Sequence, residues 1–138
     1  MVYNATQIIY DAFRESDFQC KIVEGETSSA VIAGIGGENV SFEIRFVSTD
    51  NENDVAVRVF DLCKFKADKH ADVVEACNQC NNTYRYVRFT ADDDNTVTAA
   101  FDVPLETENI GKVCVEMLIR CMRIVDEAYP SIMRAIYS

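Results

Sequence analysis

The last third of the chain carries its longest regular pattern of apolar and polar residues. Between residues 107 and 137, apolar residues recur at steps of three and four, which is the spacing of one face of an α-helix. A second apolar stripe flanks this face and consists of Val115, Ile119, Met122 and Met133. A helix with so little polar surface must be covered on more than one side. We predict one long helix that Thr107 caps and that Pro130 kinks or interrupts.

Alternation of apolar and polar residues upstream of this helix predicts strands. Residues 40–46 and 55–59 place an apolar side chain at every second position, as do strands with one face against a core. Polar or glycine-containing segments separate the alternating stretches and predict tight turns, including one at residues 36–39. The predicted strands cover residues 20–24, 30–35, 40–46, 55–59, 84–90 and 96–103.

Two more helices complete the predicted order. The first begins at Asn4, with Gln7 as its capping-box partner, and ends at residues 16–17. The second begins at Asp68 and ends near residue 82. The order is then α-β-β-β-β-α-β-β-α, in which strands are grouped rather than alternating with helices, and this favours an α+β fold. We expect a single domain over residues 1–138, with the helices packed on one face of a mainly antiparallel sheet.

Composition limits the partners of the chain, which has 138 residues and a net charge of −10. A negative field of this size repels phosphate backbones, so we expect no nucleic-acid partner. No apolar run is long enough to cross a bilayer, and the first residues lack the pattern of a signal peptide. We therefore expect a cytoplasmic protein that does not bind membranes.

Cys77 and Cys80 form the most suggestive chemical motif in the sequence. A thioredoxin-like redox pair lies at the start of a helix, whereas this pair lies near the end of one, in register with Val73. A zinc site would need two further ligands, which Cys114 and Cys121 supply only if two helices touch. Core packing is the favoured interpretation, because a buried cysteine behaves as a small apolar side chain. Redox chemistry and metal binding stay open as alternatives.

No combination of residues predicts catalysis. His70 is the only histidine, and the sequence places no nucleophile beside it, so neither a Ser/His/Asp nor a Cys/His arrangement can be assembled. The acidic turn at residues 92–95 lacks the alternating ligands, central glycine and distal glutamate of an EF-hand. Residues 34–37 lack the spacing of a dinucleotide-binding loop. We expect no enzyme, no catalytic residue, no metal site and no cofactor.

A resemblance to a known family rests on the ends of particular elements. These are the strand end at residues 59–62, the helix end at residues 73–81, and the closing hairpin and helix. In this order the chain resembles the YbjN domain family of bacterial proteins, whose fold is similar to that of type III secretion chaperones. The resemblance is best over residues 55–136, although Cys77 and Cys80 replace the leucines that typically end the middle helix. It implies a chaperone-like or regulatory protein, often dimeric, without catalytic residues.

These features favour a non-catalytic protein-binding module that forms a homodimer and binds a protein or peptide client by burial and strand addition. The residues expected at an interface are Phe60, Leu62, Val115, Ile119 and Met122. The flank of the long helix has two interpretations, a surface covered within the chain or an interface with another subunit or client. A small-molecule-sensing regulatory domain is the alternative function. Neither the client nor the strand order follows from the sequence.

Overall fold

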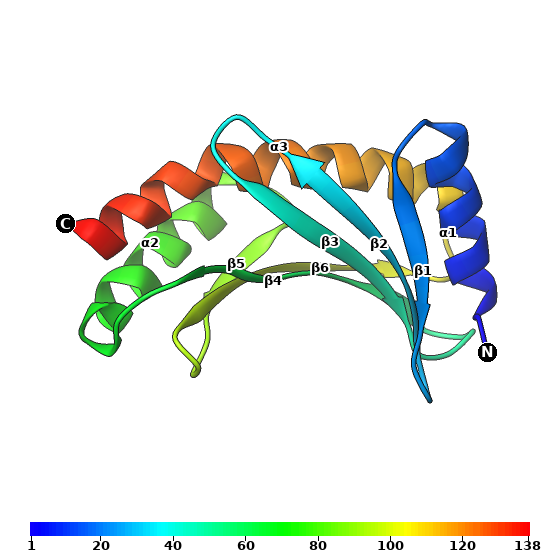
Figure 1. Cartoon of the computed structure of the whole chain (residues 1–138), viewed down its shortest axis with the longest axis horizontal. Coiled ribbons are helices and arrows are strands. Elements are labelled where there is room, and N and C mark those ends of the chain that lie inside the picture. Colours follow the sequence, from blue (N-terminus) through cyan, green and yellow to red (C-terminus); the bar gives the residue numbers. More distant parts are fainter.

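Six strands form one antiparallel sheet, and three helices lie on one of its faces (Figure 1). The computed structural model describes residues 1–138. The helices are α1 (Asn4–Glu15), α2 (His70–Thr83), which a 3-10 turn η1 (Ala67–Lys69) precedes, and α3 (Ile110–Tyr137). The strands are β1 (Cys20–Glu24), β2 (Ser29–Gly36), β3 (Ser41–Ser48), β4 (Asp54–Lys64), β5 (Arg88–Ala91) and β6 (Thr96–Pro104). This arrangement confirms the predicted α+β class and the predicted order of elements.

The strand order in the sheet is β1-β2-β3-β4-β6-β5. The first four strands follow one another as hairpins, as the short polar turns between them predict. After β4 the chain forms α2 and returns to the sheet as β5 at its far edge. β6 then folds back between β5 and β4. It pairs with β4 over most of its length, but with β5 only over the four residues that end at Ala100.

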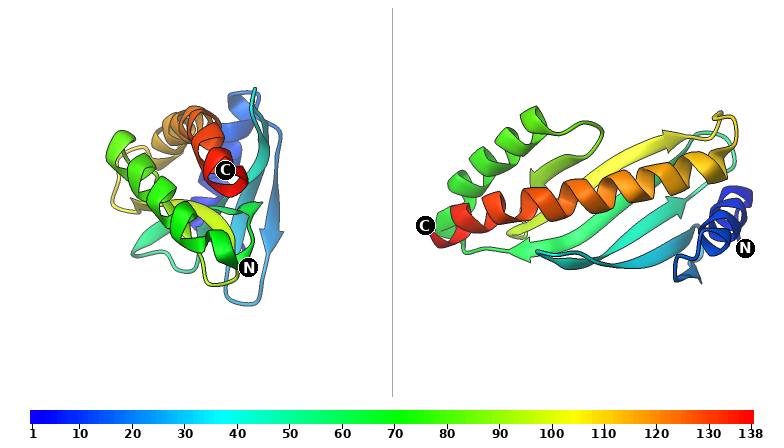
Figure 2. Two further views of the ribbon diagram at one scale, coloured as in Figure 1. Left: turned by 90° about the vertical axis from the view of Figure 1, so that its left-hand side faces the viewer. Right: turned by 90° about the horizontal axis from the view of Figure 1, so that it is seen from above.

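The long helix α3 spans the sheet and contacts both other helices (Figure 2). Its buried face includes Cys114, Leu118 and Val125, which are all fully buried and follow the predicted three- and four-residue steps. α1 crosses α3 at Gly111, where a Cβ would lie 3.0 Å from the Cβ of Ala12. α2 packs toward the other end of α3 (Figure 1). The helix layer and the inner face of the sheet therefore share one core.

The helices begin without the side-chain caps that the sequence predicts. The hydroxyl of Thr107 donates to the end of β6, and α3 starts only after Asn109, whose φ is 56°. Asn4 is already helical, and its amide donates to the side chain of Asn51 in a distant turn. Asp68 lies inside η1 and caps no helix. Contacts between elements, rather than local capping, determine where these helices start.

α3 continues through Pro130, so the predicted interruption is wrong. Proline has no amide to donate to the carbonyl of Asp126, four residues earlier. That carbonyl accepts a hydrogen bond from the side chain of Asn39 instead, over 3.0 Å. The carboxylate of Asp126 in turn accepts hydrogen bonds from the amides of Glu38, Asn39 and Val40. The turn between β2 and β3 therefore stabilises α3 at the position where proline weakens it.

β5 begins at Arg88 rather than at residue 84, where alternation predicts its start. The amide of Val87 donates to the carbonyl of Arg85 over 2.8 Å, which closes a three-residue turn around Tyr86. Tyr86 has a φ of 69°, and a γ-turn with positive φ at its centre is rare and strained. Because of this turn, the residues before Arg88 do not continue the pairing of β5 with β6.

Candidate binding surfaces

The six cysteines are free thiols, and four of them lie in the core. Cys77 and Cys80 of α2 and Cys114 and Cys121 of α3 are buried. Burial raises the pKa of Cys77, Cys114 and Cys121 to about 12, and it also raises the pKa of Cys80. Such thiols stay protonated at neutral pH, whereas the thiolate is the nucleophile and the metal ligand. The core-packing interpretation of Cys77 and Cys80 is confirmed.

One half of β6 lies at an open edge of the sheet. β5 pairs with β6 no further than Ala100, so the following residues have no strand on that side (Figure 2, right). In an antiparallel ladder, successive residues point their N–H and C=O groups alternately to the two neighbouring strands. The amide of Leu105 donates on the β4 side. By this alternation, the amide and the carbonyl of Asp102 point to the open side.

The outer edge of β5 is covered, in contrast to the open half of β6. The side chain of Asn81, near the end of α2, donates to the carbonyl of Phe89 over 3.0 Å. It also accepts a hydrogen bond from the amide of Phe89 over 2.6 Å. Uncovered strand edges pair readily with other chains, and proteins commonly block them. The same hairpin therefore has one blocked edge and one open edge.

An apolar groove of about 300 Å³ lies beside the open half of β6. Its apolar walls come from β6, from the first half of α3 and from the turn before β5. They are formed by Phe101, Val103, Pro104, Val113, Met117 and Tyr86. Arg88 also lines the groove, and the guanidinium of Arg120 lies over the ring of Tyr86, 5.4 Å from its centroid. Asp102 lines the groove as well, but its carboxylate pairs with Arg58 over 2.9 Å, whereas Arg88 has no ion-pair partner within the chain.

Sequence reasoning missed this groove, although one signal for it exists. In residues 84–90 the apolar positions shift phase between Tyr86 and Val87, and such a shift indicates a break in a strand. A sparsely populated backbone conformation, such as the turn with positive φ at Tyr86, costs a non-glycine residue about 1–3 kcal/mol. Tyr86 is 59% exposed, so core packing does not explain this strain. Strained residues cluster at functional sites, which favours a binding role for the segment.

The predicted interface residues of α3 lie on its solvent-facing side. Ile119 is 48% exposed, and Val115 and Met122 are half-buried on either side of it. Val115 lies beside α1, and Met122 lies beside the turn between β2 and β3. The three residues form an apolar strip along the helix. Their role as an interface stays a prediction.

The two predicted interface residues of β4 differ in exposure. A register shift between Val59 and Cys63 makes a bulge in β4, and Asp61 has a φ of 51° there. Phe60 is 56% exposed, whereas Leu62 is 7% exposed and belongs to the core. Only Phe60 is therefore available for contact with a partner in this conformation.

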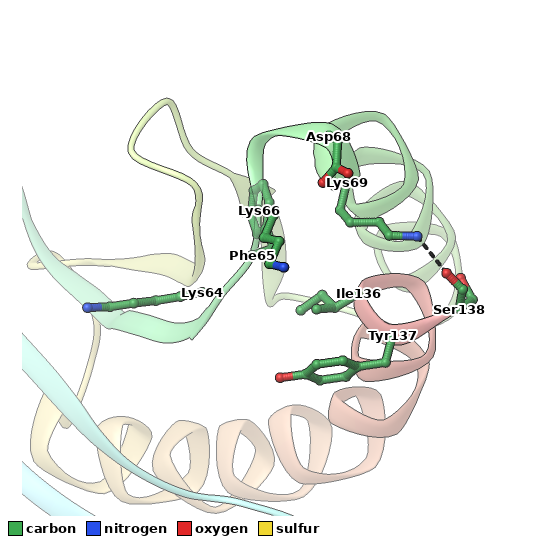
Figure 3. A pocket seen from close by; sticks show the side chains of 8 residues that line it. All are labelled: Lys64, Phe65, Lys66, Asp68, Lys69, Ile136, Tyr137 and Ser138. Atoms are coloured by element: carbon green, nitrogen blue, oxygen red, sulfur yellow. Dashed lines mark hydrogen bonds between the residues drawn. The ribbon is translucent and has the colours of Figure 1, made fainter.

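A hollow of about 570 Å³ lies between the start of α2 and the end of α3 (Figure 3). Three lysines contribute to its lining, but they are not equally available. Lys69 donates to the backbone oxygen of Ser138 over 2.5 Å, and the ammonium group of Lys64 extends away from the hollow (Figure 3). Lys66 alone remains to bind an anion there. The small-molecule-sensing alternative stays a prediction.

The fold and its surfaces define a two-layer α+β protein that exposes an open strand edge, an apolar groove and an apolar helix strip. None of its helices combines the length and the apolar character needed to cross a membrane. The chain belongs to the YbjN family, whose model carries the description "Putative bacterial sensory transduction regulator" and matches residues 6–132. This description agrees with a regulatory module. No curated protein and no solved structure matches the chain, so the likeness to type III secretion chaperones stays a prediction.

Proposed function

We propose that the chain is a non-catalytic regulatory module that binds an extended segment of a partner protein along the open half of β6. The observation that carries this proposal is the combination, at one place, of an unpaired strand edge and an apolar groove. Strand addition gains affinity from main-chain hydrogen bonds and specificity from side-chain pockets. The match to a family of regulators supports a binding role.

The geometry of β6 determines how the segment lies. A strand that continues the line of β5 runs antiparallel to β6, as β5 does. It exchanges two hydrogen bonds with the amide and the carbonyl of Asp102. Each bond contributes about 0.5–1.5 kcal/mol net, so most of the affinity comes from apolar side chains that enter the groove.

The groove and its rim determine the chemistry of the segment. Side chains alternate between the two faces of a strand, so every second side chain of the partner enters the groove between Phe101 and Met117. Aliphatic side chains fit these apolar walls. Arg88, which lines the groove and has no ion-pair partner within the chain, favours a carboxylate on the intervening side chain beside it. The expected segment therefore alternates aliphatic and acidic residues.

A synthetic peptide of alternating valine and glutamate tests the proposal. We expect its titration into isotopically labelled protein to shift the NMR signals of Asp102 and Val103, and to slow hydrogen exchange at the Asp102 amide. Tyr86→Asn keeps the backbone turn, because asparagine adopts positive φ more often than most residues do, but removes the aromatic wall. Binding should weaken about tenfold in this variant without loss of stability.

Two controls make this experiment decisive. Val23→Glu changes an exposed residue of β1, the other edge strand, and should leave peptide binding unchanged. A peptide with lysine in place of glutamate should bind more weakly, because it meets Arg88 with like charge. Signal shifts that gather at β1, or wild-type affinity in Tyr86→Asn, would show that the proposed site is wrong.

A further inference from the structure

The face of the sheet opposite the helices has no element over it, and a row of basic side chains crosses it. All three helices lie on the other face (Figure 1). In an antiparallel sheet, the side chains of directly opposite residues lie side by side on the same face. The pairing of the strands places one such row across all six of them. From β1 to β5 this basic row consists of Lys21, Ile32, Arg45, Arg58, Ala100 and Arg88.

The basic row points away from the core. Its neighbours along the strands, such as Val31, Phe46 and Phe89, belong to the core beneath the helices. Alternation therefore directs the side chains of the row to the opposite face. Ile32 and Ala100 are nevertheless only 5% exposed. Long basic side chains lay their aliphatic stems along apolar neighbours and keep the charge in water, so the flanking basic residues explain this burial.

Most of the positive charge in this row is not neutralised within the chain. Arg58 pairs with the carboxylate of Asp102 over 2.9 Å. Lys21, Arg45 and Arg88 have no ion-pair partner. Arg45 and Arg58 are moreover direct cross-strand partners, and like charges in such a pair are destabilising. The chain has 23 acidic and 13 basic residues, so an unfavourable arrangement of cations in it favours a binding role.

We propose that the basic row binds an extended acidic segment of a partner protein, which lies across the strands. Carboxylates of the segment complement the unpaired cations. Neighbouring strands are about 4.8 Å apart, so the row is about 24 Å long and matches about eight residues of an extended chain. A flexible segment can follow the twist of the sheet, as disordered segments do when they wrap a surface.

The surroundings of the basic row favour a protein segment over a nucleic acid. A parallel row of apolar residues lies beside it on β1 to β4 and can contact aliphatic side chains of a partner. This row consists of Val23, Ala30, Val47 and Ala56. Single-stranded nucleic acids bind by stacking their bases on aromatic side chains, and neither row contains one.

Binding of a fluorescent oligoglutamate peptide of about eight residues to the whole chain tests the proposal. We expect binding that weakens as salt is added, with shifts of the NMR signals of Lys21 and Arg45. Arg45→Glu should weaken binding about tenfold. This variant also places opposite charges side by side at Arg58, so its midpoint of urea unfolding should not fall. Arg45→Lys keeps the charge and should bind like wild type, whereas Lys21→Glu should weaken binding as Arg45→Glu does.

Arg123→Glu, an equal charge change on an exposed residue of α3, is the matched control and should leave binding unchanged. Equal weakening by Arg123→Glu and Arg45→Glu would show that only net charge matters, and the proposal would be wrong. A wild-type chain that binds no peptide at low salt would overturn it as well. Tighter binding of a single-stranded oligonucleotide of similar length, lost in Arg45→Glu, would show that the row selects phosphates rather than carboxylates.

The outcome is independent of the strand-addition proposal, although Arg88 belongs to the basic row and also lines the β6 groove. Oligoglutamate has no aliphatic side chains to fill that groove, and the tested variants lie on β1 and β3. Tyr86→Asn should therefore leave oligoglutamate binding unchanged. Weaker binding in Tyr86→Asn but not in Arg45→Glu would place the peptide in the groove and overturn the proposal for the basic row.

Discussion

At the scale of single residues, Ser29 and Ser48 show that equally buried hydroxyls can have opposite effects. The two serines are cross-strand partners in β2 and β3, and both are buried. The hydroxyl of Ser29 lies 2.8 Å from that of Thr6 and accepts a hydrogen bond from the amide of Tyr3. The hydroxyl of Ser48 has no partner. A buried polar group without a partner costs about 1–3 kcal/mol.

The same substitution should therefore change stability in opposite directions at these two positions. Ser48→Ala removes an unsatisfied hydroxyl and should raise the free energy of unfolding by about 1 kcal/mol. Ser29→Ala breaks two hydrogen bonds and should lower it by about 1–2 kcal/mol. Urea unfolding of both variants measures the difference. A loss of stability in Ser48→Ala would show that its hydroxyl has a partner.

The exposure of the predicted interface residues of β4 also depends on a local feature, the bulge after Val59. Alternation along β4 places Val55, Val57 and Val59 in the core, and its simple continuation places Leu62 on the opposite face with Phe60. The bulge after Val59 shifts the phase, so Leu62 enters the core. No sequence pattern marks this bulge, because it arises from pairing with β6.

At the scale of elements, periodic burial predicts most helices and strands, since that period is a direct result of one face lying in a core. The wrong predictions concern positions at which contacts with a second element determine the local structure. Thr107 bonds to the end of β6 and does not cap α3. Pro130 is tolerated because Asn39 bonds to the carbonyl that it leaves free. The open edge of β6 results from the order of the strands in the sheet. The alternation of apolar and polar residues carries no information about that order.

The contact between Asn39 and α3 can be tested as a coupled pair. Asn39→Ala should lower the free energy of unfolding by about 1 kcal/mol, because the carbonyl of Asp126 loses its partner. Pro130→Ala supplies a backbone amide to the same carbonyl, so the effect of Asn39→Ala should shrink in that background. Urea unfolding of the two single variants and the double variant measures this coupling. Additive effects would contradict the explanation.

At the scale of the whole molecule, buried thiols link stability to pH. Burial raises the pKa of Cys63 to about 11 and that of Cys77, Cys114 and Cys121 to about 12, from 9.0. Above pH 9.0 the unfolded chain loses thiol protons that the folded chain keeps. The free energy of unfolding therefore falls as pH rises through this range, by about 1.4 kcal/mol per pH unit for each such thiol.

Removing one thiol isolates its share of this pH dependence. Under reducing conditions, the wild-type chain should lose stability steeply between about pH 9 and pH 11. Cys121→Ala should show a slope that is shallower by about 1.4 kcal/mol per pH unit, whatever its stability at neutral pH. Urea unfolding at several pH values measures both slopes. Identical slopes would mean that Cys121 ionises as readily in the folded chain as in the unfolded one.

The position of α3 after all six strands has a consequence for synthesis. The ribosome completes every strand before it adds the helix that covers them. Until then, the side of the sheet that bears Val57 and Phe101 has no α3 against it. Nascent chains with exposed apolar surface are prone to aggregation. A ribosome that stalls before residue 110 would therefore hold a sheet without its main cover, and the protection of that intermediate would fall to the chaperones of the cell.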